Sequence, residues 1–157
     1  MRLFLFVDLD MKISSNTFDT ISSIKDKSGY CALALIDPDP KNDRKLELIL
    51  NKINLSNSNA ILIGGSSISD DKYEERVKFI KDNTDLPLIV FPGSSKQITK
   101  YIDTILYLNL ISGRNPKYLI DEQVKGSLNI YNFKIHAIPT AYILLDGGNM
   151  TSVANVS

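Results

Sequence analysis

Hydrophobic and polar positions along the chain follow two periods, one typical of buried strands and one typical of amphipathic helices. Residues 31–36 (CALALI) are continuously apolar, as expected of a parallel strand that is buried on both faces. Residues 42–55 place apolar side chains every three to four positions, with charged residues between them, which predicts a helix. A strand followed by a helix is therefore the first unit of the fold.

The same unit repeats along the chain, and a fifth strand follows the last helix. Further strands are predicted at residues 60–63, 86–91, 104–110 and 135–145. Pro139 interrupts the last of these. Further helices are predicted at residues 70–82, 96–102 and 118–129. Such alternation gives a parallel α/β sheet, either open and doubly wound or closed into a (β/α)₈ barrel, and periodicity alone leaves both architectures open.

Length and charge favour a single domain that handles a small molecule. The chain has 157 residues, enough to bury a core, and its 18 basic and 18 acidic side chains cancel. No long run of either sign occurs, so we expect no nucleic-acid partner and no anionic lipid surface. The single Cys31 has no partner within the chain, which suits a reducing cytoplasm.

The N-terminal residues are expected to lie outside the main domain. Residues 3–9 are apolar, but they include Asp8 and are far shorter than the ~20 residues that a spanning helix needs, so we expect no transmembrane segment. We divide the chain into an N-terminal extension with a first helix region, residues 1–28, and one domain at residues 29–157.

Small, polar or acidic residues follow the predicted strands, at the sheet edge where ligands bind in both architectures. Asp37 follows the first strand, and the second and third strands are followed by Gly64, Gly65, Ser66 and Gly93. Carboxylate and hydroxyl oxygens suit Mg²⁺, which often takes only one or two ligands from the protein. Glycines let a diphosphate approach the backbone near a helix N-terminus. On spacing alone, however, Asp37 fits a helix cap and the glycines fit ordinary turns.

From about residue 32 to residue 157, the chain resembles the geranylgeranylglyceryl phosphate synthase family, in particular its branch found in bacteria as well as archaea. Five segments at consecutive strand ends carry the resemblance: ALIDPD (34–39), AILIGGSS (60–67), LPLIVFPGSS (86–95), LISGRNPKYLI (110–120) and IPTAYILLDGGNMTSVANVS (138–157). The family adopts a modified (β/α)₈ barrel. The resemblance therefore implies an incomplete TIM barrel, roughly its first five strands.

The resemblance also implies an activity, a cofactor and a set of site residues. The family transfers a geranylgeranyl or similarly long prenyl group from geranylgeranyl diphosphate to sn-glycerol-1-phosphate, in ether-type phospholipid biosynthesis. By resemblance, Asp37 and Ser66 hold Mg²⁺, while Gly64, Gly65 and Gly93 bind substrate. No catalytic residue is assigned. We further expect a cytoplasmic enzyme that forms a homo-oligomer when full length.

Two departures from the family pattern affect these expectations. The family usually has a lysine after IDPD, and Pro40 stands there instead, which removes a cation near the metal and the phosphates. In addition, a full barrel takes roughly 250 residues, so the later glycine-rich loops that build the family's glycerol-phosphate site are not part of this sequence. We expect the 157-residue chain alone to be inactive and to associate through open strand edges.

Two alternatives remain beside the prenyltransferase. One is another phosphate-binding TIM-barrel enzyme, such as an isomerase or aldolase, which would need a lysine or glutamate at a strand end to act as base or Schiff-base former. The other is a truncated half-barrel without catalysis, serving as a binding module that pairs with another chain.

Overall fold

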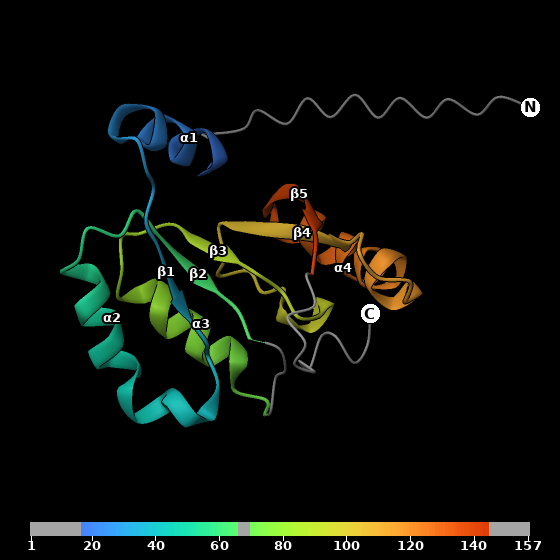
Figure 1. The fold of residues 1–157 in the computed structure, drawn as a ribbon. Coiled ribbons are helices and arrows are strands. Elements are labelled where there is room, and N and C mark those ends of the chain that lie inside the picture. The colour runs from blue at the N-terminus through green and yellow to red at the C-terminus, as the bar shows by residue number, and fades with distance from the viewer. Residues whose placement is uncertain (1–16, 66–69, 145–157) are drawn as a thin grey trace, which may run out of the picture.

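Five parallel strands form one sheet, and their order in space is their order in the sequence. The computed structural model describes residues 17–65 and 70–144. The strands are β1 (Leu33–Ile36), β2 (Ala60–Ile63), β3 (Leu88–Val90), β4 (Thr104–Leu110) and β5 (His136–Tyr142) (Figure 1). A doubly wound sheet reverses its strand order at a switch point, whereas a barrel wall does not. The uninterrupted order across β1 to β5 therefore identifies part of a TIM barrel.

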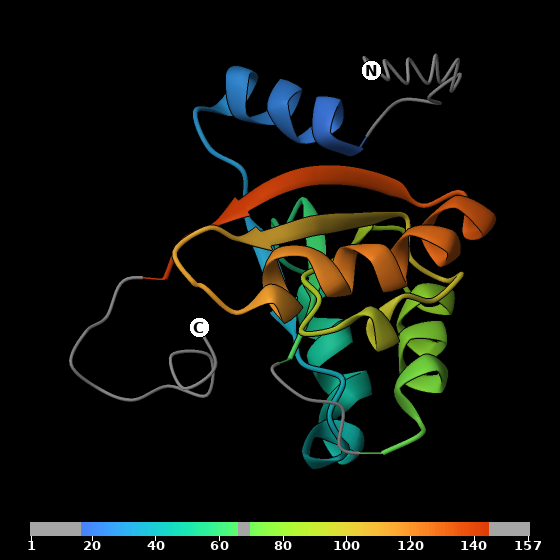
Figure 2. The ribbon, with the colours of Figure 1, turned by 90° about the vertical axis from the view of Figure 1, so that its right-hand side faces the viewer.

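Three helices cover one side of this sheet, and a fourth lies apart from them. The four are α1 (Thr17–Ser28), α2 (Leu46–Asn54), α3 (Tyr73–Asp82) and α4 (Glu122–Phe133). Helix α1 leads into β1 and stands away from the other three helices (Figures 1 and 2). None of its residues is buried. No helix in the described part of the chain is long and apolar enough to cross a membrane.

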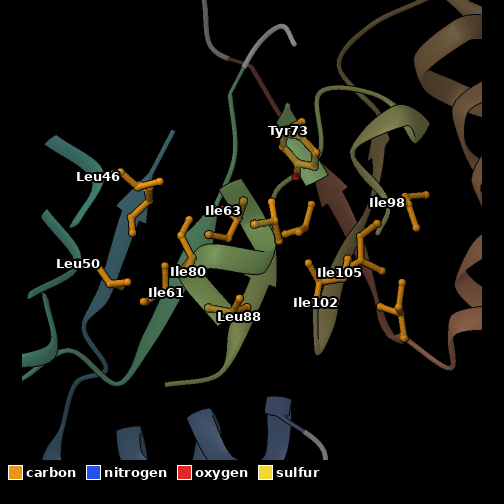
Figure 3. Close-up of a cluster of buried hydrophobic side chains, with 14 residues drawn as sticks. Leu46, Leu50, Ile61, Ile63, Tyr73, Ile80, Leu88, Ile98, Ile102 and Ile105 are labelled. Carbon is orange, nitrogen blue, oxygen red and sulfur yellow. The ribbon is translucent and has the colours of Figure 1, made fainter. Parts of the chain in front are cut away.

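The hydrophobic core lies between the strands and the helices that cover them. Alternate strand residues point toward the helices, so that Ile61 and Ile63 of β2 meet Leu50 of α2 and Ile80 of α3 (Figure 3). All four side chains are 0 or 1 % exposed. Burying each of them contributes about 1.5–3 kcal/mol to stability. This packing fixes the strand ends from which the candidate site is built.

The opposite face of the sheet, which would line the barrel interior, is partly open. Leu33 and Leu35 of β1 lie on this face beside Ala60 and Leu62 of β2. Leu33 is 44 % exposed and Leu35 is 63 % exposed. Within the described residues, β1 and β5 each pair with only one neighbour. The open edges and the exposed inward leucines agree with the expected partial barrel.

The helix predicted at residues 96–102 is wrong. A three-residue 3₁₀ turn, η2 (Ser95–Gln97), stands in its place, and Ile98 is already extended with φ −88° and ψ 112°. Thr99 Oγ1 accepts a hydrogen bond from Tyr101 N, and such local bonds compete with a helix. The apolar periodicity of this segment instead reflects Ile98 and Ile102, which both join the core.

Other differences concern the ends of elements. The helix predicted from residue 42 begins with a 3₁₀ turn, η1 (Pro40–Lys45), and the one predicted from residue 118 begins with a π-helical turn, η3 (Lys117–Asp121). Strand β5 runs through Pro139 without a break. His136 N bonds to Asp103 O and Ile111 N bonds to Tyr142 O, so the even-numbered residues of β5 face β4. The missing N–H of Pro139 therefore lies on the open edge, where a strand tolerates it.

Candidate functional site

The carboxylate of Asp37 lies against the glycine turn that follows β2. A Cβ placed on Gly65 would lie 2.3 Å from Asp37 Oδ1, closer than real Cβ contacts come. Only glycine therefore lets the turn approach the carboxylate at this point. Two strand ends that lie 28 positions apart in the sequence thus meet, as the predicted site requires.

Asp37 is not the helix cap that its spacing also allowed. The cap of η1 is Asp39, whose Oδ1 accepts a hydrogen bond from Lys41 N at 3.0 Å. Asn42 Nδ2 donates to the Asp37 backbone carbonyl at 2.8 Å and holds the turn in place. The Asp37 side chain is 31 % exposed, so its carboxylate remains accessible beside Gly65.

A lysine does lie beside the candidate metal ligand, contrary to the expectation drawn from Pro40. Lys41 Nζ donates to Asp37 Oδ2 at 2.7 Å, and this hydrogen bond raises the pKa of Lys41. Pro40 occupies the first position of η1, where a proline is well tolerated. The 3₁₀ turn then brings the next residue, Lys41, back over Asp37 and restores the cation.

The structure brings together the three glycines assigned to substrate binding. A Cβ on Gly64 would lie 2.6 Å from the backbone oxygen of Phe91, so Gly64 lets β2 and β3 end close together. Gly93 N donates to Gln97 Oε1 at 2.5 Å, and Gln97 Nε2 donates to Gly65 O at 3.0 Å. The glycines are explained first by close contacts within the protein, and their role toward a ligand stays a prediction.

A largely apolar cavity of about 300 Å³ opens beside these turns. Gly64, Gly65 and Gly93 are part of its lining. Its apolar wall includes Leu35, Phe91, Ile98, Ile105, Leu108, Leu110 and Tyr142. The rings of Phe91 and Tyr142 pack edge to face, with centroids 5.4 Å apart. Ile98, which follows η2, and Ile105 of β4 complete this wall.

Tyr107 and Tyr142 also line this cavity. The Tyr107 hydroxyl donates to the Gln123 carbonyl at 2.5 Å, and partial burial raises the pKa of Tyr107. The raised pKa and the hydrogen bond that the hydroxyl donates both keep this phenol protonated. Tyr107 therefore belongs to the cavity wall.

A buried arginine joins the loops after β1 and β2 and was missed by the sequence analysis. Arg76 on α3 is 6 % exposed. Its guanidinium bonds to Asp43 through Nε at 2.5 Å and to Asp70 through Nη1 at 2.6 Å. The hydrogen bonds from Arg76 hold the pKa of Asp70 at about 2 and also lower that of Asp43. One sequence feature could have revealed Arg76: this charged residue interrupts the apolar face of α3 that Tyr73 and Val77 form.

The donor set at this edge fits a magnesium ion bound through few protein ligands. Among residues 17–65 and 70–144, no group of three acidic, histidine or cysteine side chains gathers to form a larger metal centre. Asp37 supplies an accessible carboxylate beside a glycine turn, and Mg²⁺ is often held by one or two carboxylates together with substrate phosphates. The second predicted ligand, Ser66, lies outside the described residues.

Comparison with known proteins shows which family the chain belongs to. A model of the PcrB family matches residues 23–157. The chain belongs to this family. It is 44 % identical over 123 residues to the geranylgeranylglyceryl phosphate synthase of Zunongwangia profunda, covering 78 % of this chain and 52 % of that protein. It is 39 % identical over 150 residues to that of Flavobacterium johnsoniae, covering 95 % and 61 %. The family resemblance drawn from the strand-end motifs is thereby confirmed.

Solved structures of PcrB-family relatives share the fold. The (S)-3-O-geranylgeranylglyceryl phosphate synthase of Thermoplasma acidophilum, solved in complex with its substrate sn-glycerol-1-phosphate, matches with a TM-score of 0.80 and 30 % identity, covering 91 % of this chain and 57 % of that one. The synthase of Thermoplasma volcanium matches with a TM-score of 0.71 and 31 % identity, covering 80 % and 50 %. The chain therefore spans about half to three-fifths of the length of its relatives, as a partial barrel should.

Proposed function

We propose that the full-length protein is a Mg²⁺-dependent prenyltransferase that moves a geranylgeranyl group from its diphosphate to sn-glycerol-1-phosphate. The PcrB-family match and the activity named for the relatives support this proposal. The Thermoplasma acidophilum relative binds sn-glycerol-1-phosphate, which supports the acceptor. We place the reaction in the cytoplasm, in ether-type phospholipid synthesis, and propose a homo-oligomeric enzyme.

One observation carries the proposal: a partly exposed carboxylate lies against a glycine that lines an apolar cavity. Asp37 lies against Gly65, and Gly65 is part of the cavity lining. A prenyl diphosphate has a charged head and a hydrocarbon tail, and this arrangement offers each part a matching surface. Burying the tail against such walls contributes about 25 cal/mol for each Å² of apolar surface removed from water.

In the proposed reaction, a glycerol hydroxyl oxygen bonds to C1 of the prenyl group while the bond from C1 to diphosphate breaks, and the hydroxyl proton passes to the departing diphosphate or to water. Bound Mg²⁺ would neutralise the negative charge that develops on the leaving diphosphate. Asp37 and, by family resemblance, Ser66 would hold it. Lys41, whose ammonium lies 2.7 Å from Asp37, adds positive charge on the same side. The Phe91 and Tyr142 rings and Leu108 keep water from the tail.

Removing the carboxylate of Asp37 tests the proposal. In the full-length protein, Asp37→Ala should reduce Mg²⁺-dependent prenyl transfer by about 10²-fold or more, because a metal ligand is lost. Asp39→Asn is the matched control, since it changes the neighbouring carboxylate but keeps an oxygen for the cap of η1. Transfer by Asp37→Ala at the rate of the control would remove Asp37 from the metal site. The family membership favours this activity over the isomerase, aldolase and half-barrel alternatives.

A further inference from the structure

Gln97 is a polar side chain buried in the turn after β3. It is 2 % exposed, one of four polar or charged residues that are buried in the described part of the chain. Burying an amide is costly unless both its donor and its acceptor are hydrogen-bonded. The proposed chemistry does not involve Gln97, so its burial needs another explanation.

The amide of Gln97 joins two turns that come from different strands. Its Oε1 accepts from Gly93 N at 2.5 Å, in the turn after β3. Its Nε2 donates to Gly65 O at 3.0 Å, in the turn after β2. Two hydrogen bonds also hold the backbone of Gln97 in place. The Gln97 N–H donates to Ser94 O at 3.0 Å, and the Tyr73 hydroxyl donates to the Gln97 carbonyl at 3.2 Å.

The side-chain bridge formed by the Gln97 amide begins where the backbone hydrogen bonds between β2 and β3 end. The hydrogen bond from Phe91 N to Ile63 O, at 2.7 Å, is the last backbone bond between the ends of β2 and β3 among the described residues. Beyond it, the turns at Gly65 and Gly93 are connected through the Gln97 side chain. An amide alone suits this place, because one turn offers a carbonyl and the other an N–H. A glutamate would place a carboxylate oxygen against the Gly65 carbonyl oxygen, and neither oxygen can donate a hydrogen bond to the other.

We propose that Gln97 is a positioning residue that sets the spacing of the turns at Gly65 and Gly93 for a diphosphate head group. The inference rests on the proposed function, since that function places a diphosphate between these turns. The effect extends to Asp37, because Gly65 lies directly against its carboxylate. Gln97 therefore acts on ligand binding through Gly65, Gly93 and Asp37 and need not touch the ligand itself.

The experiment compares three variants of the full-length protein with one control. Gln97→Glu keeps the shape but lacks the donor, Gln97→Met lacks both polar atoms, and Gln97→Asn keeps both on a shorter arm. Tyr73→Phe is the matched control, because it removes the hydroxyl that bonds to the Gln97 backbone and leaves the side-chain bridge intact. Calorimetry measures binding of inorganic pyrophosphate with Mg²⁺, amide exchange measures protection of Gly93 N–H, and steady-state assays separate KM from kcat.

We expect all three Gln97 variants to bind Mg²⁺ and pyrophosphate about 10- to 100-fold more weakly, because a misplacement near 1 Å has effects of this size. KM for the prenyl diphosphate should rise, and the Gly93 amide should exchange faster in Gln97→Met, which lacks the accepting oxygen. The Tyr73→Phe control keeps both side-chain hydrogen bonds of Gln97, so it should lose much less affinity than any Gln97 variant. Wild-type pyrophosphate affinity in folded Gln97→Glu and Gln97→Met would overturn the inference. Failure of all three variants to fold would equally contradict it, since Gln97 would then be a purely structural residue.

The outcomes for Gln97 and for the proposed function can be told apart. If the wild type transfers prenyl groups and the Gln97 variants keep its KM, the positioning role is wrong and the function stands. If the wild type binds Mg²⁺ and pyrophosphate in a manner that depends on Gln97 but transfers no prenyl group, the function is wrong and the positioning role stands. A wild-type protein that binds no pyrophosphate would overturn both.

Discussion

The contact between Gly65 and Asp37 gives the sharpest prediction about the candidate site. In Gly65→Ala, the new Cβ would lie 2.3 Å from Asp37 Oδ1, whereas real Cβ atoms stay at least 3.0 Å away. The carboxylate and the turn must therefore separate by roughly 0.7 Å. Metal sites hold their ligands within about 0.2 Å, and a shift near 1 Å costs about 10²-fold in activity. We expect Mg²⁺ affinity to fall about 10- to 100-fold, or about 1.4–2.7 kcal/mol.

The same substitution should have little effect on stability. Asp37 is partly exposed, so its carboxylate turns toward solvent instead of straining the core. We expect the free energy of unfolding to fall by less than about 1 kcal/mol, below the usual cost of overpacking. Metal titration and chemical denaturation of the full-length protein measure the two effects. Gly126→Ala is the control, because its Cβ would meet the movable Cδ1 of Ile98 at 2.6 Å. Unchanged Mg²⁺ affinity in Gly65→Ala would show that Gly65 does not position Asp37 for the metal.

Three further predictions concern stability and association. Arg76 holds the pKa of Asp70 at about 2, below its ordinary value of 3.8. The Asp70 carboxylate therefore stabilises the fold above about pH 4, and this contribution is lost as the pH falls toward 2. Denaturation across this range should show a weaker acid dependence for Asp70→Asn, and an unchanged one would contradict the ion pair. Leu50→Ala should destabilise by about 2–5 kcal/mol, because Leu50 is 1 % exposed, whereas Leu55→Ala, at an 88 % exposed position, should change stability by less than about 0.5 kcal/mol. The 157-residue chain alone should associate, and Leu35→Ser should reduce this association in light scattering; a monodisperse wild-type monomer would contradict that expectation.

The strands were predictable from sequence because each is a short, continuously apolar run. Residues 60–63 were predicted within their observed bounds, and 104–110 likewise. Periodicity failed at residues 96–102, where Ile98 and Ile102 are spaced as in a helix but reach the core from an irregular segment. Local spacing records which residues are buried, and it cannot show whether a helix or a loop brings them there.

The meeting of Asp37 with the glycine turns was predictable because parallel strands end at one edge of a sheet. The residues that hold this edge together were not. Arg76 and Gln97 act through partners up to 38 positions away along the chain, whereas Lys41 pairs with Asp37 four positions before it. A charged or amide side chain gives no local sign of such a partner, so only the folded arrangement reveals it.

The most direct test of the central proposal is a transfer assay with the two glycerol phosphate enantiomers. The full-length protein is incubated with radiolabelled geranylgeranyl diphosphate and either sn-glycerol-1-phosphate or sn-glycerol-3-phosphate, with Mg²⁺ and with Mg²⁺ removed by a chelator. We expect labelled prenyl ether from sn-glycerol-1-phosphate only, and only when Mg²⁺ is present. Equal product from both enantiomers, or product that persists without the metal, would contradict it.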